Sequence, residues 1–290
     1  MPIDFPLDLA PVIDRDVAAA LAEDIGAGDL TAQLVPAGKT GRATVIAREA
    51  GILCGTGWFD ACFRQLDAGV KIDWQAQDGD RIAADQLLCT ITGEARTLLS
   101  AERSALNFLQ LLSAVASKTR IYADAVAGTR AQVVDTRKTL PGLRIAQKYA
   151  VRVGGGANHR LALWDAILIK ENHILAAGGI QPALVAARRS AEAAGERCRF
   201  IQIEVESIAE LEEALTADAG MILLDNFTLA MMREAATLNA GRAILEASGN
   251  VTLETLREIA LTGVDRISIG ALTKDVKALD LSMRFAASAS

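Results

Sequence analysis

Residues 201–250 read IQIEVESIAELEEALTADAGMILLDNFTLAMMREAATLNAGRAILEASGN. This stretch holds three short, largely apolar runs, which end in Glu204, Asp225 and Glu246 at intervals of 21 residues. Such an interval accommodates one strand, one helix and two short loops. Ile/Val/Leu runs that alternate with helical patterns are typical of a parallel sheet buried on both faces. The stretch therefore predicts successive β/α units.

Three further runs extend the pattern on both sides, at 133–135, 167–170 and 267–270. Helical patterns alternate with the six runs and lie at 141–151, 181–194, 207–217, 228–239 and 252–261. Ser207 with Glu210 matches a capping box at the start of the third of these patterns. We expect an α/β barrel domain over residues 116–274. In such architectures ligands bind at the carboxyl ends of the strands, so the residues that end the runs are candidate site residues.

The first part of the chain lacks this rhythm. Residues 41–93 are strand-like without intervening helices, whereas 95–126 form a long helical pattern in which we expect an interruption near 113–117. We interpret residues 1–115 as a separate α+β domain. The apolar tail, 275–290, is expected to pack back on it.

Composition narrows the class of protein. The net charge of −6 over 290 residues argues against a general nucleic-acid binder, and no apolar stretch approaches a membrane span. The acidic start of the sequence does not match a signal peptide. The four cysteines show no CxxC spacing, which favours reduced thiols over metal ligands or disulfides. We therefore expect a cytoplasmic protein that binds neither membrane nor nucleic acid.

The basic residues are concentrated in one segment. Six Lys and Arg residues and no acid lie between Arg137 and Arg160, which indicates a site for a small anion. The glycine triplet at 154–156 leaves the backbone free to approach a ligand, and His159 and Arg160 follow it. A glycine triplet is often only a flexible loop, but its place in an acid-free segment favours a binding role.

The ends of the other runs supply further candidates. Lys170 would be costly to desolvate at the end of an apolar strand, so we expect it to bind an anion or to act as a Schiff-base nucleophile. Glu204 and Asp225 form a carboxylate pair suited to Mg²⁺ or to ribose hydroxyls. The small-residue loops at 247–250 and 270–271 are suited to phosphate.

These motifs resemble the quinolinate phosphoribosyltransferase family. The resemblance rests on stretches that run in order through nearly the whole chain: EDIGAGDLT (23–31), AERSALNFLQLLS (101–113), DTRKTLPGLR (135–144), GGGANHR to DAILIKENH (154–173), IEVE (203–206), LLDNF (223–227), EASGN (246–250) and GVDRISIGALTK (263–274). It implies an α/β fold, with an N-terminal α+β sandwich domain and an incomplete α/β (TIM-like) barrel. It also implies an obligate homodimer in which the N-terminal domain of the partner completes each active site.

The resemblance also implies roles for individual residues. Arg103 would cross the dimer interface to the quinolinate carboxylates and join an anion pocket made by Arg137, His159, Arg160 and Lys170. The phosphoribosyl diphosphate would meet Thr136, Lys138, Ser248, Gly249, Asn250, Ile269, Gly270 and Ala271. Glu204 and Asp225 would serve the ribose and Mg²⁺, directly or through substrate or water. The catalytic set is then Lys138, Lys170, Glu204 and Asp225. The LTKD sequence at 272–275 departs from the LTHS of many relatives.

The implied enzyme is a pentosyltransferase of de novo NAD biosynthesis. It would convert quinolinate and phosphoribosyl diphosphate to nicotinate mononucleotide, pyrophosphate and CO₂, with Mg²⁺ and no organic cofactor. Three alternatives stay open at the level of sequence. They are a related phosphoribosyltransferase for another aromatic acid, a Schiff-base lyase that uses Lys170, and a non-catalytic phosphate-sensing barrel.

Overall fold

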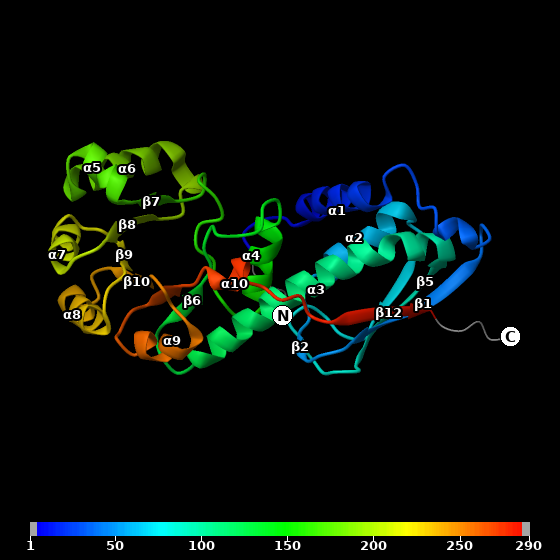
Figure 1. Ribbon diagram of the computed structural model, residues 1–290. Coiled ribbons are helices and arrows are strands. Elements are labelled where there is room, and N and C mark those ends of the chain that lie inside the picture. The colour runs from blue at the N-terminus through cyan, green and yellow to red at the C-terminus, as the bar shows by residue number, and fades with distance from the viewer. Residues whose placement is uncertain (1–4, 286–290) are drawn as a thin grey trace. The chain divides into compact units, whose positions relative to one another are not determined.

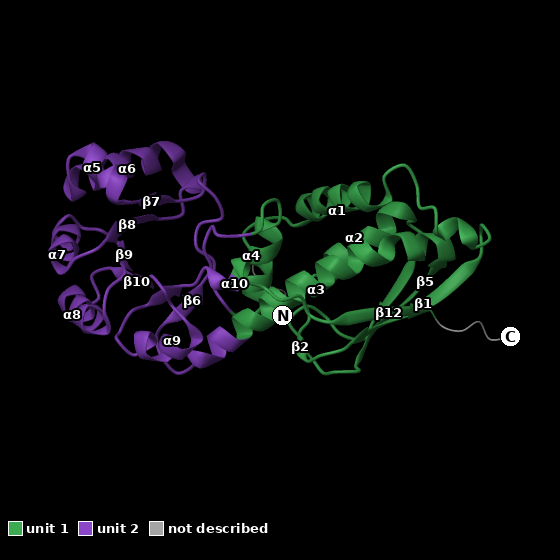
Figure 2. Cartoon of the chain, viewed as in Figure 1, with its two compact units in different colours: residues 1–120, 140–155, 273–290 green, residues 121–139, 156–272 purple. Residues whose placement is uncertain are grey.

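The computed structural model describes residues 5–285, and they divide into two compact units (Figure 2). The first unit comprises residues 5–120, 140–155 and 273–285, and the second comprises 121–139 and 156–272. Residues 140–155, which we placed with the barrel from the sequence, thus count with the first unit. No helix in the described part of the chain is long and apolar enough to cross a membrane.

An antiparallel sheet and four helices form the first unit (Figure 1). The sheet has the order β12-β1-β5-β3, so the C-terminal strand pairs with β1, and β2 pairs separately with β4. The strands are β1 (Thr40–Ala47), β2 (Gly51–Ile52), β3 (Lys71–Trp74), β4 (Arg81–Ile82), β5 (Leu87–Glu94) and β12 (Leu281–Phe285). The helices are α1 (Ala10–Ile25), α2 (Thr56–Leu66), α3 (Ala95–Ala125, which continues into the second unit) and α4 (Arg144–Val153), with a 3₁₀ turn, η1, at Ala32–Leu34.

Helix α3 is continuous, so the interruption expected near 113–117 is wrong. The two serines that suggested a break serve a close approach between helix and strand instead. Ser113 Oγ accepts from Cys54 N at 2.9 Å, and Ser117 Oγ accepts from Ile52 N at 2.7 Å. A side chain on Gly51 would meet Ser117 Oγ at 2.7 Å, which shows how closely the backbone lies against the helix.

Helix α4 is fixed within the first unit through Tyr149. Its hydroxyl donates to Asp78 Oδ2 at 2.9 Å, and its ring lies 5.7 Å from that of Trp58. Asp78 also accepts from the backbone N–H groups of Gly55 and Thr56 at the start of α2. One partly buried carboxylate therefore joins α4 to α2.

A six-stranded parallel sheet with helices on its outside forms the second unit (Figure 1). Its order is β6-β11-β10-β9-β8-β7, and β6 and β7 do not pair among the described residues, so the barrel is open between them. The strands are β6 (Gln132–Val134), β7 (Ile167–Ile169), β8 (Ile201–Val205), β9 (Met221–Asp225), β10 (Ile244–Ser248) and β11 (Arg266–Ser268). The helices are α5 (Glu171–Ala177), α6 (Ile180–Ala194), α7 (Ile208–Thr216), α8 (Leu229–Asn239), α9 (Leu253–Ala260) and α10 (Ala271–Lys274, across the unit boundary), with a 3₁₀ turn, η2, at Gly195–Arg197.

The structure confirms the expected fold class and all six strands of the barrel. Ser207 caps α7 as expected, since its Oγ accepts from Glu210 N, but the reciprocal bond of a capping box is not formed, because Glu210 Oε2 accepts from Glu206 N and not from Ser207 N. The sequence analysis missed α5, a helix of 7 residues between β7 and α6. It is too short to show an apolar periodicity, and none of its residues is buried.

Candidate functional site

A cavity of about 340 Å³ lies within the second unit. Residues from β7 to β11 and from the segments after β6 and before β7 line it: Thr136, Arg137, Lys138, His159, Arg160, Leu168, Lys170, Glu204, Leu223, Glu246, Ser248 and Ser268. Eight of these twelve are residues to which the sequence analysis assigned a role, so the structure brings most of the predicted set to one place.

The strand residues of the cavity follow a period of two. Lys170 and Ser248 each follow another lining residue, Leu168 and Glu246, by two positions. Ser268 follows Arg266, the ion-pair partner of Glu246, by two positions. Residues i and i+2 of a strand lie on the same face of a sheet. The register agrees, because Glu204 pairs with Leu223, Leu223 with Glu246, and Glu246 with Arg266. The inner face of the sheet therefore builds the cavity.

Two guanidinium groups occupy the same side of the cavity. Arg160 is 8% exposed, and both burial and the neighbouring Arg137 lower its pKa, while Asp165 opposes the shift. The Nε of Arg137 is buried and has no hydrogen-bond partner among the described residues. Like charges kept together in a buried place favour an anion between them.

Lys170 and Glu204 form an ion pair across neighbouring strands, with Nζ 2.5 Å from Oε2. The lysine side chain is 49% exposed and the glutamate side chain 12%. The residue lies directly after the last strand position, Ile169, where the chain meets solvent. Its charge is available at the open end of the cavity.

Both ring nitrogens of His159 have partners. Nδ1 accepts from the backbone N–H of Arg160 at 2.7 Å, and Nε2 lies 2.6 Å from Oε1 of Gln202. The backbone N–H of His159 donates to Asp135 Oδ1 at 2.9 Å, and the ring meets Phe200 edge-on at 5.3 Å. His159 is thus fixed in one orientation beside Arg160.

A buried ion pair lies at the floor of the cavity. Glu246 is fully buried on β10, and its Oε2 accepts from Arg266 Nε at 2.9 Å. Burial raises the pKa of Glu246, whereas Arg266, Gln202 and Ser268 act in the opposite direction. Its second oxygen, Oε1, lies 3.7 Å from His159 Nε2 and has no hydrogen-bond partner within the described residues.

The loop after β10 is held tightly against the loop after β9. Gly249 has φ +104°, and an added Cβ would meet Asn226 Oδ1 at 2.2 Å. Asn226 N donates to Ser248 O at 3.0 Å, and Asn226 Nδ2 donates to Asp225 Oδ2 at 2.8 Å. After β11, a Cβ on Gly270 would approach Lys138 Cδ at 3.1 Å. Only glycine fits at 249, where both the backbone angle and the space require it.

The glycine triplet does not lie against a ligand cavity. A Cβ on Gly154 would meet Ala116 O at 2.4 Å and Thr119 Cβ at 2.6 Å, both on α3. Gly154 ends α4, and Gly155 follows with φ +90° beside Arg120. The ligand role expected for the triplet is therefore wrong for its first two residues. Their small size permits close packing of helix against helix.

Seven of the predicted site residues are not in the cavity lining. Six of them lie directly beyond lining residues on the same strands or loops: Asp225, Gly249, Asn250, Ile269, Gly270 and Ala271. The seventh, Arg103, is exposed on α3 in the first unit. It makes no salt bridge or hydrogen bond to residues 5–285; burial raises the pKa of the neighbouring Glu102, and the charge of Arg103 opposes this rise.

Four lining residues were given no role by the sequence analysis: Leu168, Leu223, Ser268 and Glu246, of which Glu246 ends a run. Each lies two positions before a predicted residue. The sequence analysis did not step back by two along each strand from the residues to which it gave a role. The period of two would have found all four, and also the buried Gln202 before Glu204.

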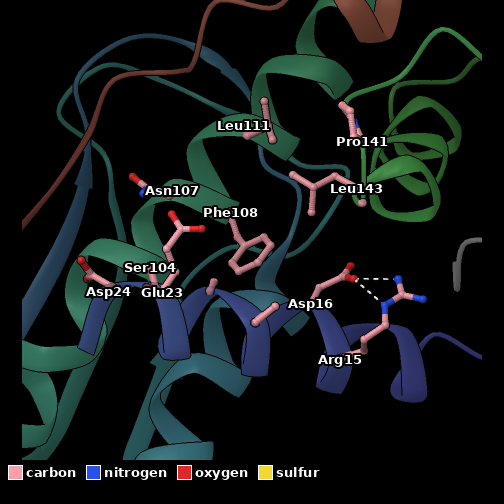
Figure 3. A pocket seen from close by; sticks show the side chains of 13 residues that line it. Arg15, Asp16, Glu23, Asp24, Ser104, Asn107, Phe108, Leu111, Pro141 and Leu143 are labelled. Carbon is pink, nitrogen blue, oxygen red and sulfur yellow. Dashed lines mark hydrogen bonds and ion pairs between the residues drawn. The ribbon is translucent and has the colours of Figure 1, made fainter. Parts of the chain in front are cut away.

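A larger cavity, of about 500 Å³, lies in the first unit between α1, α3 and residues 141–143 (Figure 3). Its charged lining is mainly acidic, since Asp16, Glu23 and Asp24 outnumber Arg15, and Asp16 already binds Arg15 and Trp58. This sign is opposite to the one that a small anion requires. We therefore place the candidate site in the second unit.

No group of three or more His, Cys, Asp or Glu residues within 5–285 could hold a metal ion alone. Mg²⁺ commonly binds through one or two carboxylates together with substrate phosphates and water. Glu204 and Asp225, on one face of neighbouring strands, fit that second kind of site. All four cysteines are free thiols.

Comparison with known proteins agrees with this geometry. Residues 29–113 match the family model "Quinolinate phosphoribosyl transferase, N-terminal domain", and residues 115–284 match the C-terminal domain of the same family. The "probable nicotinate-nucleotide pyrophosphorylase [carboxylating]" of Bacillus subtilis is 41% identical, over 90% of this chain and 89% of that protein. The corresponding protein of Mycobacterium leprae is 41% identical, over 92% and 95%. The structure of the Francisella tularensis nicotinate-nucleotide pyrophosphorylase covers 98% of each chain, with a TM-score of 0.92 and 40% identity. The chain belongs to the quinolinate phosphoribosyl transferase family.

Proposed function

We propose that this protein transfers the phosphoribosyl group of phosphoribosyl diphosphate to quinolinate and releases pyrophosphate and CO₂. The product is nicotinate mononucleotide, so the reaction belongs to NAD biosynthesis. The observation that carries the proposal is the pair Arg137 and Arg160, whose charges are held together at one buried side of the cavity. Quinolinate carries two adjacent carboxylates, and guanidinium groups bind carboxylates in a bidentate manner.

The other side of the cavity suits the sugar and the diphosphate. Lys138 and Thr136 lie beside Gly270, and Ser248 begins the tight loop that contains Gly249. Glu204 and Asp225 would hold the ribose hydroxyls and the Mg²⁺ that accompanies the diphosphate. Bound there, Mg²⁺ would stabilise the charge of the leaving pyrophosphate.

The chemistry requires positioning and electrostatic stabilisation. The ring nitrogen of quinolinate attacks C1′ of the ribose as the bond from C1′ to the diphosphate oxygen breaks, and Lys138 stabilises the departing anion. Glu204 and Asp225 stabilise the positive charge that develops on the sugar. The new pyridinium ring accepts the electron pair when the bond to the neighbouring carboxylate breaks and CO₂ leaves. That ring carbon then takes a proton from water.

We further propose a homodimer in which Arg103 reaches the quinolinate site of the partner subunit. Its exposure on α3 and its lack of an ion-pair partner among the described residues support this role. The free thiols support a cytoplasmic location. No feature of the site suggests a membrane or nucleic-acid partner.

One assay tests the proposed reaction: release of pyrophosphate and CO₂ from quinolinate and phosphoribosyl diphosphate, with and without Mg²⁺. We expect both products in equal amounts and a dependence on Mg²⁺. Nicotinate, which lacks the second carboxylate, serves as the matched control and should react poorly. Efficient turnover of nicotinate, or no CO₂ from quinolinate, would contradict the assignment and favour another aromatic acid.

The Schiff-base alternative makes a different prediction for Lys170. A nucleophilic lysine is usually desolvated, whereas Lys170 is half exposed and paired with Glu204. Borohydride treatment during turnover should therefore trap no adduct at Lys170. A trapped adduct would support the lyase instead.

A further inference from the structure

Two buried polar atoms below the cavity lack hydrogen-bond partners and complement each other. Gln202 Nε2 is a donor, Glu246 Oε1 is an acceptor, and neither has a partner within 3.5 Å among the described residues. Both residues are fully buried. Both side chains approach the same atom, His159 Nε2: Gln202 Oε1 lies 2.6 Å from it and Glu246 Oε1 lies 3.7 Å from it.

The partners of His159 fix the position of its proton. A backbone N–H can only donate, so Nδ1, which accepts from Arg160 N at 2.7 Å, carries no proton. The proton of the neutral ring is then on Nε2, which donates to Gln202 Oε1 at 2.6 Å. The amide orientation agrees, because its oxygen and not its nitrogen faces the imidazole.

We propose that Gln202 is a positioning residue that holds His159 neutral, as the Nε2–H tautomer, so that its Nδ1 fixes the backbone of Arg160. The amide oxygen of Gln202 accepts from the imidazole, and the imidazole in turn accepts from the backbone N–H of Arg160. His159 thus contributes orientation to the anion site, and Arg160 contributes charge.

The charged groups around the ring agree with this arrangement. The Oε1 atom of Glu246 lies 3.7 Å from Nε2 of His159, and the Oε2 atom of the same carboxylate is paired with Arg266. Asp135 accepts from the backbone N–H of His159 and also from Asn158 Nδ2 at 2.6 Å. A second proton on the ring would have to displace the N–H of Arg160 from Nδ1. Each acidic group near His159 therefore has another partner.

The tautomer can be observed without any assay of activity. Histidine labelled with nitrogen-15 gives distinct long-range proton–nitrogen spectra for the two neutral tautomers and for the imidazolium ion. The chain has only 2 histidines, so the variant His173→Gln assigns the signals. In the unsubstituted protein we expect His159 to remain the neutral Nε2–H form from about pH 6 to 8. An Nδ1–H tautomer or an imidazolium ion there would overturn the proposal.

The link to binding rests on the proposed function and needs a second variant. Gln202→Met keeps the length of the side chain and removes the hydrogen bond to His159, and Gln132→Met on β6, where the side chain is exposed, is the matched control. We expect Gln202→Met to alter the His159 spectrum and to raise the Kd and KM for quinolinate at least about tenfold, with a smaller effect on kcat. The same affinity and spectrum as in the control would overturn the positioning role. Absence of quinolinate turnover in the unsubstituted protein would instead refute the proposed function, and the spectrum of His159 would still decide the tautomer.

Discussion

Arg137 lies close enough to Arg160 to lower the pKa of Arg160, and both residues line the same cavity. Separating two cations would relieve this repulsion, yet the fold holds them together. The surrounding loops are fixed by contacts such as that between His159 and Asp135. The protein is therefore arranged in advance for an anion that neutralises both groups.

Loss of one guanidinium should weaken quinolinate binding. In Arg160→Ala we expect a loss of about 2–5 kcal/mol of binding free energy, which includes the cost of the substrate carboxylate left unpaired. The measurement is KM and kcat for quinolinate, with Arg189→Ala on the exposed face of α6 as the control. Equal kinetics for the two variants would place the substrate elsewhere.

The buried carboxylate of Glu246 should make the free energy of unfolding depend on pH. Burial raises its pKa above the ordinary 4.5, so the folded protein retains this proton over a pH interval in which the unfolded chain has lost it. The free energy of unfolding therefore falls as pH rises through that interval. Relative to Glu246→Gln, the unsubstituted protein should lose stability as pH rises from about 4.5, measured by urea unfolding.

A second carboxylate provides a control of opposite sign. The pKa of Glu254, exposed at the start of α9, is lowered by the Thr252 hydroxyl. Relative to Glu254→Gln, the unsubstituted protein should lose stability as pH falls below about 4.5. Parallel pH curves for the two variants would show that the environment of Glu246 differs from the one described.

Gly249 should be intolerant of a side chain. In Gly249→Ala the added Cβ would meet Asn226 Oδ1 at 2.2 Å, and the backbone has φ +104°. We expect a loss of about 1–3 kcal/mol of stability and a higher KM for phosphoribosyl diphosphate. Gly220→Ala, where nothing lies within 4 Å, is the matched control. A Gly249→Ala variant as stable and active as the control would rule out a tight loop at this position.

Arg103 should act across the subunit interface. Mixing Arg103→Ala with Lys138→Ala gives heterodimers in which one of the two sites retains both residues. If subunits exchange at random, about a quarter of the full activity should return, from two nearly inactive proteins. The same mixture measured before exchange is the control. No recovery after exchange, shown to be complete by labelled subunits, would refute the shared site.

Much of this fold could be predicted from residues that act on their neighbours in the sequence. The runs that end in Glu204 and Asp225 predicted strands because a parallel strand buried on both faces needs a continuous apolar sequence. The hydroxyl of Ser207 predicted the start of a helix because capping involves neighbours in the chain. The family resemblance then supplied the substrate, which local patterns alone did not.

What the sequence could not supply depends on contacts between distant residues. Ser113 and Ser117 suggested a break in a helix, but their hydroxyls bond to a strand some sixty residues away. Gly154 suggested a ligand loop, but it accommodates the backbone of α3. Glu246 was noted as a rim acid, and its burial beside Arg266 emerges only from the sheet register.

The location of Tyr149 on α4 limits how the protein can be dissected. The second unit is not one uninterrupted piece of polypeptide, because residues 140–155 leave it and return. A truncated gene product that starts at residue 116 would keep α4 but lack Asp78 and Trp58, the partners of Tyr149. The exposed aromatic ring would favour aggregation, so expression trials should use the full-length chain.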